Sequence, residues 1–224
     1  MQKMIIVLLN LIVLSTLEAK NLELKKIYVD GHEEVLLFDE NVESITIYSS
    51  DAHQGEVKDI VGLNQFKNLT ELDFPMINYN GDWSFLYGLT TLKTLFINSS
   101  SKNLKSIKFL ESLTNLEIFG LDLIINEKYK EDFLREKIDL GKLNKIDRIY
   151  YYSRFLKEDY SGWYFTGRIP NFVNVKNKPK IYLDNNGIEY LTFREKILLK
   201  QYSEVNLYSN PISENKKPKR WNSI

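Results

Sequence analysis

The sequence predicts an α/β fold built around a parallel β-sheet whose strands follow one another at regular intervals. Three stretches share one apolar pattern, in which residues three apart give way to residues two apart, and they run over 63–74, 86–97 and 110–121. The three-residue spacing is typical of a helical turn, and the two-residue spacing of a strand. Matching positions recur every 23 to 24 residues. Each copy therefore predicts one turn and one strand that stack against the next copy.

The composition excludes several classes of protein. The chain has 224 residues, 43% of them hydrophobic, with 30 basic residues balanced by 30 acidic ones, two histidines and no cysteine. This length and composition favour a globular domain with a sizeable core over a disordered chain. Zero net charge excludes a general attraction to nucleic acid. The lack of cysteine excludes disulfide scaffolds and thiolate metal sites or nucleophiles.

Residues 1–19 have the layout of a secretory signal peptide. A short positive start precedes an apolar run over 4–14, and small residues lead to an expected cleavage after Ala19. This run is shorter than the roughly 20 residues that a membrane-spanning helix needs. We therefore expect a secreted or periplasmic protein that keeps no stable membrane anchor after cleavage. The absence of cysteine excludes a lipid-anchored lipoprotein and favours a bacterial source.

Residues 20–41 are expected to form an N-terminal cap. Two apolar segments, 27–29 and 35–38, flank the pair Asp30-Gly31, which is favoured in tight hairpin turns. A stack of repeats needs its first unit covered so that core side chains are not left in water.

The repeats extend over residues 42–212 and predict about seven strands. The segments 181–191 and 205–212 carry a fuller pattern, with Asn186 and Asn210 three residues after the strand. An asparagine amide there can hydrogen-bond backbone groups as the chain turns away from the sheet. Two further strands, at 42–47 and 146–151, fit the pattern less well. The first five units replace the asparagine with Ser50, Ile77, Ser100, Ile124 and Arg154.

The pattern L-x-x-L-x-L-x-x-N-x-I resembles that of the leucine-rich-repeat family, and the short units are most similar to those of internalin-like bacterial proteins. The resemblance implies a solenoid with a curved parallel sheet on its concave face and helical, 3-10 or irregular segments on its convex side. It also implies that the concave face is the recognition surface.

Other segments interrupt or follow the repeats. Helices are expected over 127–138, and over 192–202 with a capping box from Thr192 to Glu195. An insertion near 159–172 carries several aromatic residues with glycine and proline, and is expected to project from the solenoid. Residues 213–224 are polar and basic, as in a frayed tail or a short C-terminal cap.

Strand alternation predicts which side chains face outward on the concave surface. Tyrosine suits recognition because it combines a large apolar face with a hydrogen-bonding tip, although aromatic residues on neighbouring strands also pack on one another. Acidic residues at one end of this surface and basic residues at the other would make it dipolar. The candidate binding residues are Glu71, Asp73, Phe96, Ile118, Arg148, Tyr150, Tyr152, Lys180, Tyr182 and Tyr208.

The sequence carries no recognisable catalytic motif, neither a nucleophile elbow nor a phosphate-binding loop nor a zinc-protease helix. Its two histidines, His32 and His53, are expected in loops near the N-terminus. We therefore expect no catalysis, no cofactor and no metal, and the leading hypothesis is a module that binds a protein partner. Two alternatives are a carbohydrate-binding or enzymatic module that uses Trp163 and Tyr164 of the insertion, and a structural or adhesin component of the cell surface.

Overall fold

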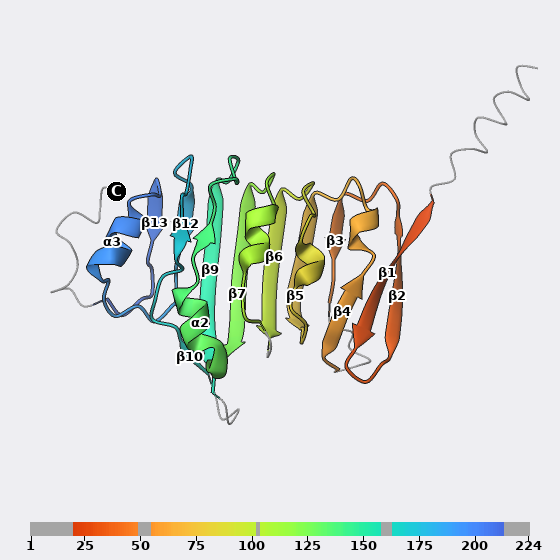
Figure 1. The fold of residues 1–224 in the computed structure, drawn as a ribbon, viewed down its shortest axis with the longest axis horizontal. Coiled ribbons are helices and arrows are strands. Elements are labelled where there is room, and N and C mark those ends of the chain that lie inside the picture. The colour runs from red at the N-terminus through yellow and green to blue at the C-terminus, as the bar shows by residue number, and fades with distance from the viewer. Residues whose placement is uncertain (1–19, 49–54, 102–103, 158–162, 213–224) are drawn as a thin grey trace, which may run out of the picture.

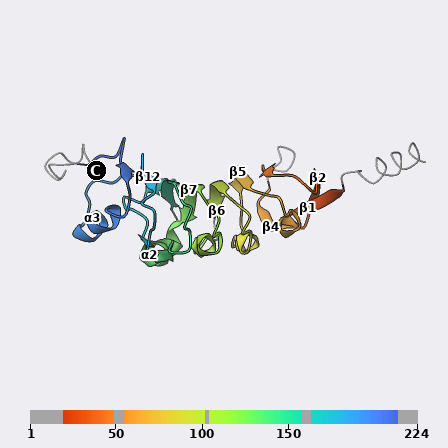
Figure 2. The same ribbon diagram turned by 90° about the horizontal axis from the view of Figure 1, so that it is seen from above.

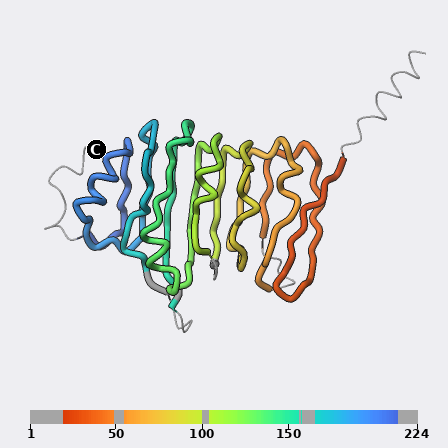
Figure 3. The backbone as a smooth tube through the Cα atoms, viewed as in Figure 1, coloured from red at the N-terminus to blue at the C-terminus, as the bar shows by residue number. Residues whose placement is uncertain are grey.

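The computed structural model describes residues 20–48, 55–101, 104–157 and 163–212. They form an elongated body of two layers, with the strands side by side in one layer and the short helices in the other (Figures 1 and 2). In each repeat unit the backbone leaves the strand layer for the helical layer and returns to it, and the two ends of the described chain lie at opposite ends of the long axis (Figure 3). The expected signal peptide and the tail at 213–224 lie outside the described residues.

A parallel sheet of seven strands forms the first layer, as the repeat spacing predicts. Each strand pairs with the next along the order β3-β5-β6-β7-β9-β12-β13. The strands are β3 (Ser44–Thr46), β5 (Glu71–Asn78), β6 (Thr94–Ser101), β7 (Ile118–Asn126), β9 (Arg148–Leu156), β12 (Lys180–Tyr182) and β13 (Glu204–Asn206).

The register of the sheet aligns the apolar pattern positions in one row across all seven strands. That row consists of Ile45, Leu72, Leu95, Phe119, Ile149, Ile181 and Val205. All but Val205 are buried, and they face the helical layer as the floor of the hydrophobic core. The predicted phase of the repeats is thus confirmed at the level of single residues.

The second layer consists of short helical turns between the strands. It contains η1 (Leu63–Gln65), η2 (Ser84–Leu86), η3 (Lys108–Ser112), η4 (Glu127–Tyr129), α2 (Lys130–Arg135) and α3 (Phe193–Leu199). The helix expected over 127–138 ends at Arg135, because Ile138 enters a short strand, β8 (Ile138–Asp139), beside β11 (Phe172–Val173). The capping box of α3 is confirmed: the Glu195 N–H donates to Thr192 Oγ1 at 3.2 Å, and the Thr192 N–H donates to Glu195 Oε2 at 2.8 Å.

The two asparagines of the repeat pattern bond to the backbone as predicted. Asn186 is fully buried; its Oδ1 accepts from the Ser153 N–H at 3.0 Å, and its Nδ2 donates to the Tyr151 carbonyl at 2.7 Å. Where an asparagine is present, β12 and β13 end after three residues each. Although β3, in one of the five units without it, has only three residues, β5, β6, β7 and β9 in the other four continue for eight or nine residues. Strand pairing there satisfies the backbone groups that asparagine would otherwise bond.

The N-terminal segment forms a separate antiparallel sheet. Strands β1 (Asn21–Tyr28) and β2 (Glu33–Asp39) form a hairpin, and β4 (Val57–Val61) pairs with the other edge of β1. Strand β4 was not predicted, because its buried residues Val57 and Ile60 are three apart and so mimic a helical spacing. Lys26 is only 3% exposed and forms an ion pair with Glu34 at 2.8 Å.

The insertion near 159–172 is more closely joined to the sheet than predicted. Its strand β10 (Trp163–Phe165) pairs antiparallel with the end of β9, while residues 158–162 lie outside the described part of the chain. Phe172, which closes the insertion, is buried and packs edge-on against Phe119 and Tyr151. In the described part of the insertion, the expectation of a projecting element is therefore wrong. None of the helices formed by the described residues has the length and apolar character of a membrane span.

Candidate functional site

The face of the parallel sheet that points away from the helical layer, called here the outer face, carries the predicted binding residues. One row of side chains crosses it in register, one residue from each strand. From β3 to β13 this row reads Thr46, Asp73, Phe96, Gly120, Tyr150, Tyr182 and Asn206.

Three aromatic side chains in this row, Phe96, Tyr150 and Tyr182, contact one another across the strands. The rings of Tyr150 and Tyr182 are stacked, with centroids 4.7 Å apart and planes 12° from parallel. The Phe96 ring reaches towards Tyr150, with centroids 6.2 Å apart. We call these three residues the aromatic row; Phe96 is 37% exposed, and the two tyrosines are half-buried.

The contact between Phe96 and Tyr150 depends on the glycine between them. Strand β7 separates β6 from β9, and its residue in the row is Gly120. A Cβ atom at this position would lie 2.3 Å from Cδ1 of Phe96. The Phe96 ring therefore lies over the backbone of β7, where only glycine leaves room for it.

A shallow hollow of about 370 Å³ opens beside the aromatic row, and we call it the sheet hollow. Side chains of the outer face and the adjoining backbone line it: Asp73, Pro75, Phe96, Ile97, Asn98, Gly120, Leu121, Asp122, Tyr150 and Tyr152. The lining therefore combines aromatic rings and a proline with two carboxylates.

The carboxylates of the outer face differ in their partners. Asp122 forms an ion pair with Arg154. Burial raises the pKa of Asp73, and a hydrogen bond from the Phe74 N–H only partly offsets it. In the described parts of the chain, no lysine or arginine forms an ion pair with Asp73. Its charge is therefore uncompensated.

Asp184, on the far side of Tyr152 from Asp122, has a similar environment. Burial raises its pKa, a hydrogen bond from the Tyr208 N–H only partly offsets this, and its Oδ1 atom is buried with no hydrogen-bond partner among the described residues. Burial also raises the pKa of Tyr152, and the neighbouring charges of Asp184 and Asp122 raise it further. A tyrosine that stays protonated between two carboxylates can donate a hydrogen bond.

The basic residues of the outer face are neutralised by neighbouring carboxylates. Lys180 Nζ lies 2.9 Å from Glu204 Oε2, and the hydrogen bond and charge of Glu204 raise the pKa of Lys180. Arg148 Nε lies 3.1 Å from Asp147 Oδ2. The positive end of the expected dipolar surface is therefore neutralised, and only the acidic end keeps an uncompensated charge.

The predicted binding residues fall into two groups on this face. The structure brings Asp73, Phe96, Tyr150 and Tyr152 together around the sheet hollow, and Tyr182 extends the aromatic row. Glu71, Ile118, Arg148, Lys180 and Tyr208 lie on the same face but do not line the hollow.

The candidate set from the sequence omitted four residues that shape this region, namely Gly120, Asp122, Arg154 and Asp184. The alternation of side chains along a strand places Gly120, Asp122 and Asp184 on the outer face, so the sequence pattern could have identified these three. The pairing of Asp122 with Arg154 joins residues 32 positions apart, and no local pattern signals it.

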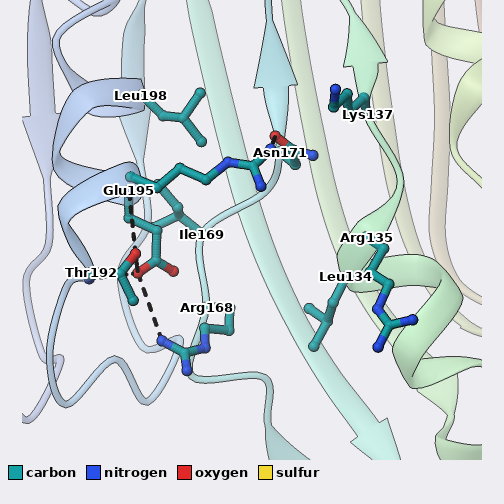
Figure 4. Close-up of a pocket in the computed structure, with 10 residues that line it drawn as sticks. Leu134, Arg135, Lys137, Arg168, Ile169, Asn171, Thr192, Glu195 and Leu198 are labelled. Atoms are coloured by element: carbon teal, nitrogen blue, oxygen red, sulfur yellow. Dashed lines mark hydrogen bonds and ion pairs between the residues drawn. The ribbon is translucent and has the colours of Figure 1, made fainter.

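A second hollow lies on the helical side of the molecule, between α2 and α3 (Figure 4). Three of its four basic side chains contact other groups of the chain. Arg168 Nη1 lies 3.7 Å from Glu195 Oε2, and Arg194 donates to Asn171 Oδ1 at 3.4 Å. Arg135, which Figure 4 draws pointing away from α3, lies 3.1 Å from Glu131. These charges are used within the fold, in contrast to that of Asp73.

Among the described residues, no group of three or more histidine, aspartate or glutamate side chains is arranged to hold a metal ion. The side chains of Trp163 and Tyr164, which the carbohydrate hypothesis requires, lie outside the described part of the structure. Comparison with known proteins finds no family model that matches the chain and no matching curated protein.

Proposed function

We propose that this chain is an exported, non-catalytic leucine-rich-repeat protein of the internalin-like bacterial type, and that its outer face binds a protein partner. The observation that carries this proposal is the aromatic row, because Phe96, Tyr150 and Tyr182 form a contiguous aromatic surface that is partly exposed on the outer face. Partly exposed aromatic clusters are enriched among the residues that dominate binding energy in protein interfaces.

Two features support the repeat assignment. The apolar positions of successive units lie in register across seven parallel strands. Asn186 and Asn210 bond the backbone of neighbouring units from equivalent positions, as expected for stacked copies of one motif.

The shape of the face favours a macromolecular partner over a small molecule. The sheet hollow is open and shallow, whereas sites for small ligands usually enclose most of the ligand surface. Seven adjacent strands spaced about 4.8 Å apart give a face roughly 29 Å wide. A surface of this width suits a protein interface of ordinary size.

The proposal is tested by selecting binders against the full chain from a displayed library of peptides and small domains. Binders are then measured against wild type and against the double variant Tyr150→Ala, Tyr182→Ala. The matched control is Phe193→Ala, which removes an aromatic side chain that is 81% exposed on α3, in the helical layer.

We expect the selected binders to lose at least tenfold in affinity for the double tyrosine variant and to bind the Phe193→Ala variant as they bind wild type. A tenfold loss of affinity corresponds to about 1.4 kcal/mol of binding free energy. The removal of two partly buried aromatic rings from an interface can cost this much. Binders that ignore both tyrosines, or a library that yields no binder, would overturn the proposal. Circular dichroism of the variants tests whether the fold is retained.

A further inference from the structure

The sheet hollow has a chemical character that the aromatic row alone does not explain. Its walls include the rings of Phe96 and Tyr150, and two carboxylates, Asp73 and Asp122, also line it. Asp122 is neutralised by Arg154. Among the described residues, no basic side chain forms an ion pair with Asp73, because Arg148 and Lys180 pair with other carboxylates. The hollow is therefore apolar and negatively charged at once.

Asp73 is held in this position at a cost. Burial raises its pKa, so the ionised carboxylate is less stable here than in water. A carboxylate in such a place is stabilised by an opposite charge that approaches it from outside the chain. The fold itself supplies that opposite charge at Asp122 but not at Asp73.

We propose that the sheet hollow receives a lysine or arginine side chain of the protein partner, with the cation beside Asp73 and its aliphatic stem against Phe96 and Tyr150. This inference rests on the proposed function and names the chemistry of the partner's contact segment. The segment is basic, and it crosses the outer face at strands β5, β6 and β7.

Each part of such a side chain has a counterpart in the hollow. A cation close to an aromatic face gains a cation–π attraction, and a guanidinium can also bond a carboxylate through two N–H groups. The methylene stem can lie along apolar surface while the charged head stays near water. The hollow of about 370 Å³ is many times the roughly 30 Å³ that one water occupies in the liquid, and so has room for a long side chain.

Other guests fit less well. An anionic group would meet the uncompensated carboxylate of Asp73, and like charges repel. A purely apolar group would bury Asp73 further without giving it a partner, which is unfavourable for an ionised carboxylate. The net negative charge of the outer face also attracts a basic segment during encounter.

The test uses synthetic peptides that correspond to the tightest binders of the displayed library. Binding is measured by calorimetry against wild type, Asp73→Asn and the control Asp132→Asn, which makes the same change on the exposed surface of α2. In a matched peptide, citrulline replaces arginine, or norleucine replaces lysine, so that the charge is lost and the length is kept.

We expect the selected peptides to be enriched in lysine or arginine. Asp73→Asn and the neutral peptide should each lower affinity about tenfold, and the two changes together should lower it little further, because they remove the same contact. The Asp132→Asn variant should bind as wild type does. The affinity of wild type should fall as the pH is lowered and Asp73 becomes protonated, and the affinity of Asp73→Asn should fall less in that range.

Two results would overturn this inference, and they differ in what they leave standing. Peptides without basic residues that bind equally well to Asp73→Asn, but lose affinity for the double tyrosine variant, would refute the basic contact and retain the proposed function. Peptides that are insensitive to the tyrosines, or the absence of any binder, would refute both.

Discussion

The Oδ1 atom of Asn210 accepts a hydrogen bond from the backbone N–H of Asn186 at 3.0 Å, and a second one from the Ile188 N–H at 3.0 Å. The two asparagines lie 24 residues apart at equivalent positions of successive units. The backbone of Asn186 is thus held by the unit that follows it, while its side chain holds the unit before it.

Replacing Asn186 with alanine should destabilise the fold by about 2 to 4 kcal/mol, because the Ser153 N–H and the Tyr151 carbonyl would lose their partner inside the protein. Urea denaturation followed by circular dichroism measures this loss. Asn210→Ala should cost less than half as much, since Asn210 is only partly buried. If the two variants lost equal amounts of stability, the degree of burial would not determine how much each asparagine contributes.

The stacked pair Tyr150 and Tyr182 should show a coupling energy of about 0.5 to 1.5 kcal/mol in a double-mutant cycle of stability. Thermal or urea unfolding of the two single alanine variants and the double variant gives this value. Because both rings are half-buried, the double variant should remain folded. If the double variant unfolded, the two rings would serve mainly to stabilise the sheet. The main observation in favour of a binding surface on the outer face would then be removed.

Asp184→Asn should stabilise the protein at neutral pH by less than about 1 kcal/mol, because the ionised carboxylate is partly buried and its Oδ1 has no partner. The folded-state pKa of Asp184 is raised, so the folded state binds this proton more tightly than the unfolded state. The destabilising effect is present at neutral pH and disappears as the pH falls through the folded-state pKa.

The advantage of the asparagine variant should therefore shrink between pH 7 and pH 4. Urea denaturation of wild type and variant at these two pH values tests the sign. A variant that is less stable than wild type at pH 7 would show that the hydrogen bond from the Tyr208 N–H to the Asp184 carboxylate outweighs the cost of burying its charge.

Gly120→Ala should displace the Phe96 ring and cost about 1 kcal/mol, because the added methyl group would overlap that ring. In a Phe96→Ala background the same change should cost nothing or stabilise slightly, since alanine restricts the unfolded chain more than glycine does. Chemical denaturation of the four proteins measures this non-additivity. Equal costs in both backgrounds would mean that backbone conformation, rather than the Phe96 ring, selects glycine.

Much of the fold could be predicted because the repeat encodes it locally. The spacing of Leu72, Leu95 and Phe119 fixes both the strands and their register, since a slip of one residue would expose the apolar row. Strand β4 could not be predicted, because its partner β1 is distant in sequence and its own pattern resembles a turn of helix. The end of α2 could not be predicted either, because Ile138 pairs in a short strand with Phe172, which lies 34 residues later in the sequence.

The candidate site was predictable in its alternation but not in its details. Period-two geometry places Phe96, Tyr150 and Tyr182 outward, yet it does not show that their rings touch across Gly120. A bulge in β5 also interrupts the alternation, because Met76 has a positive φ of 55° and the register shifts between Phe74 and Ile77. The charge of the face depended on ion pairs such as Lys180 with Glu204, which only the strand register brings together.

The order of the sheet also determines how the molecule can open. Apart from β9, which also pairs with β10, each described strand of the path from β3 to β13 has only its immediate neighbours in the path as partners, so no strand from one end closes onto the other. Such an array can lose strands one at a time from its ends while the middle stays folded. Amide hydrogen exchange should accordingly be slowest in β7 and β9, which share the most extensive pairing, and should quicken stepwise towards β3 and β13.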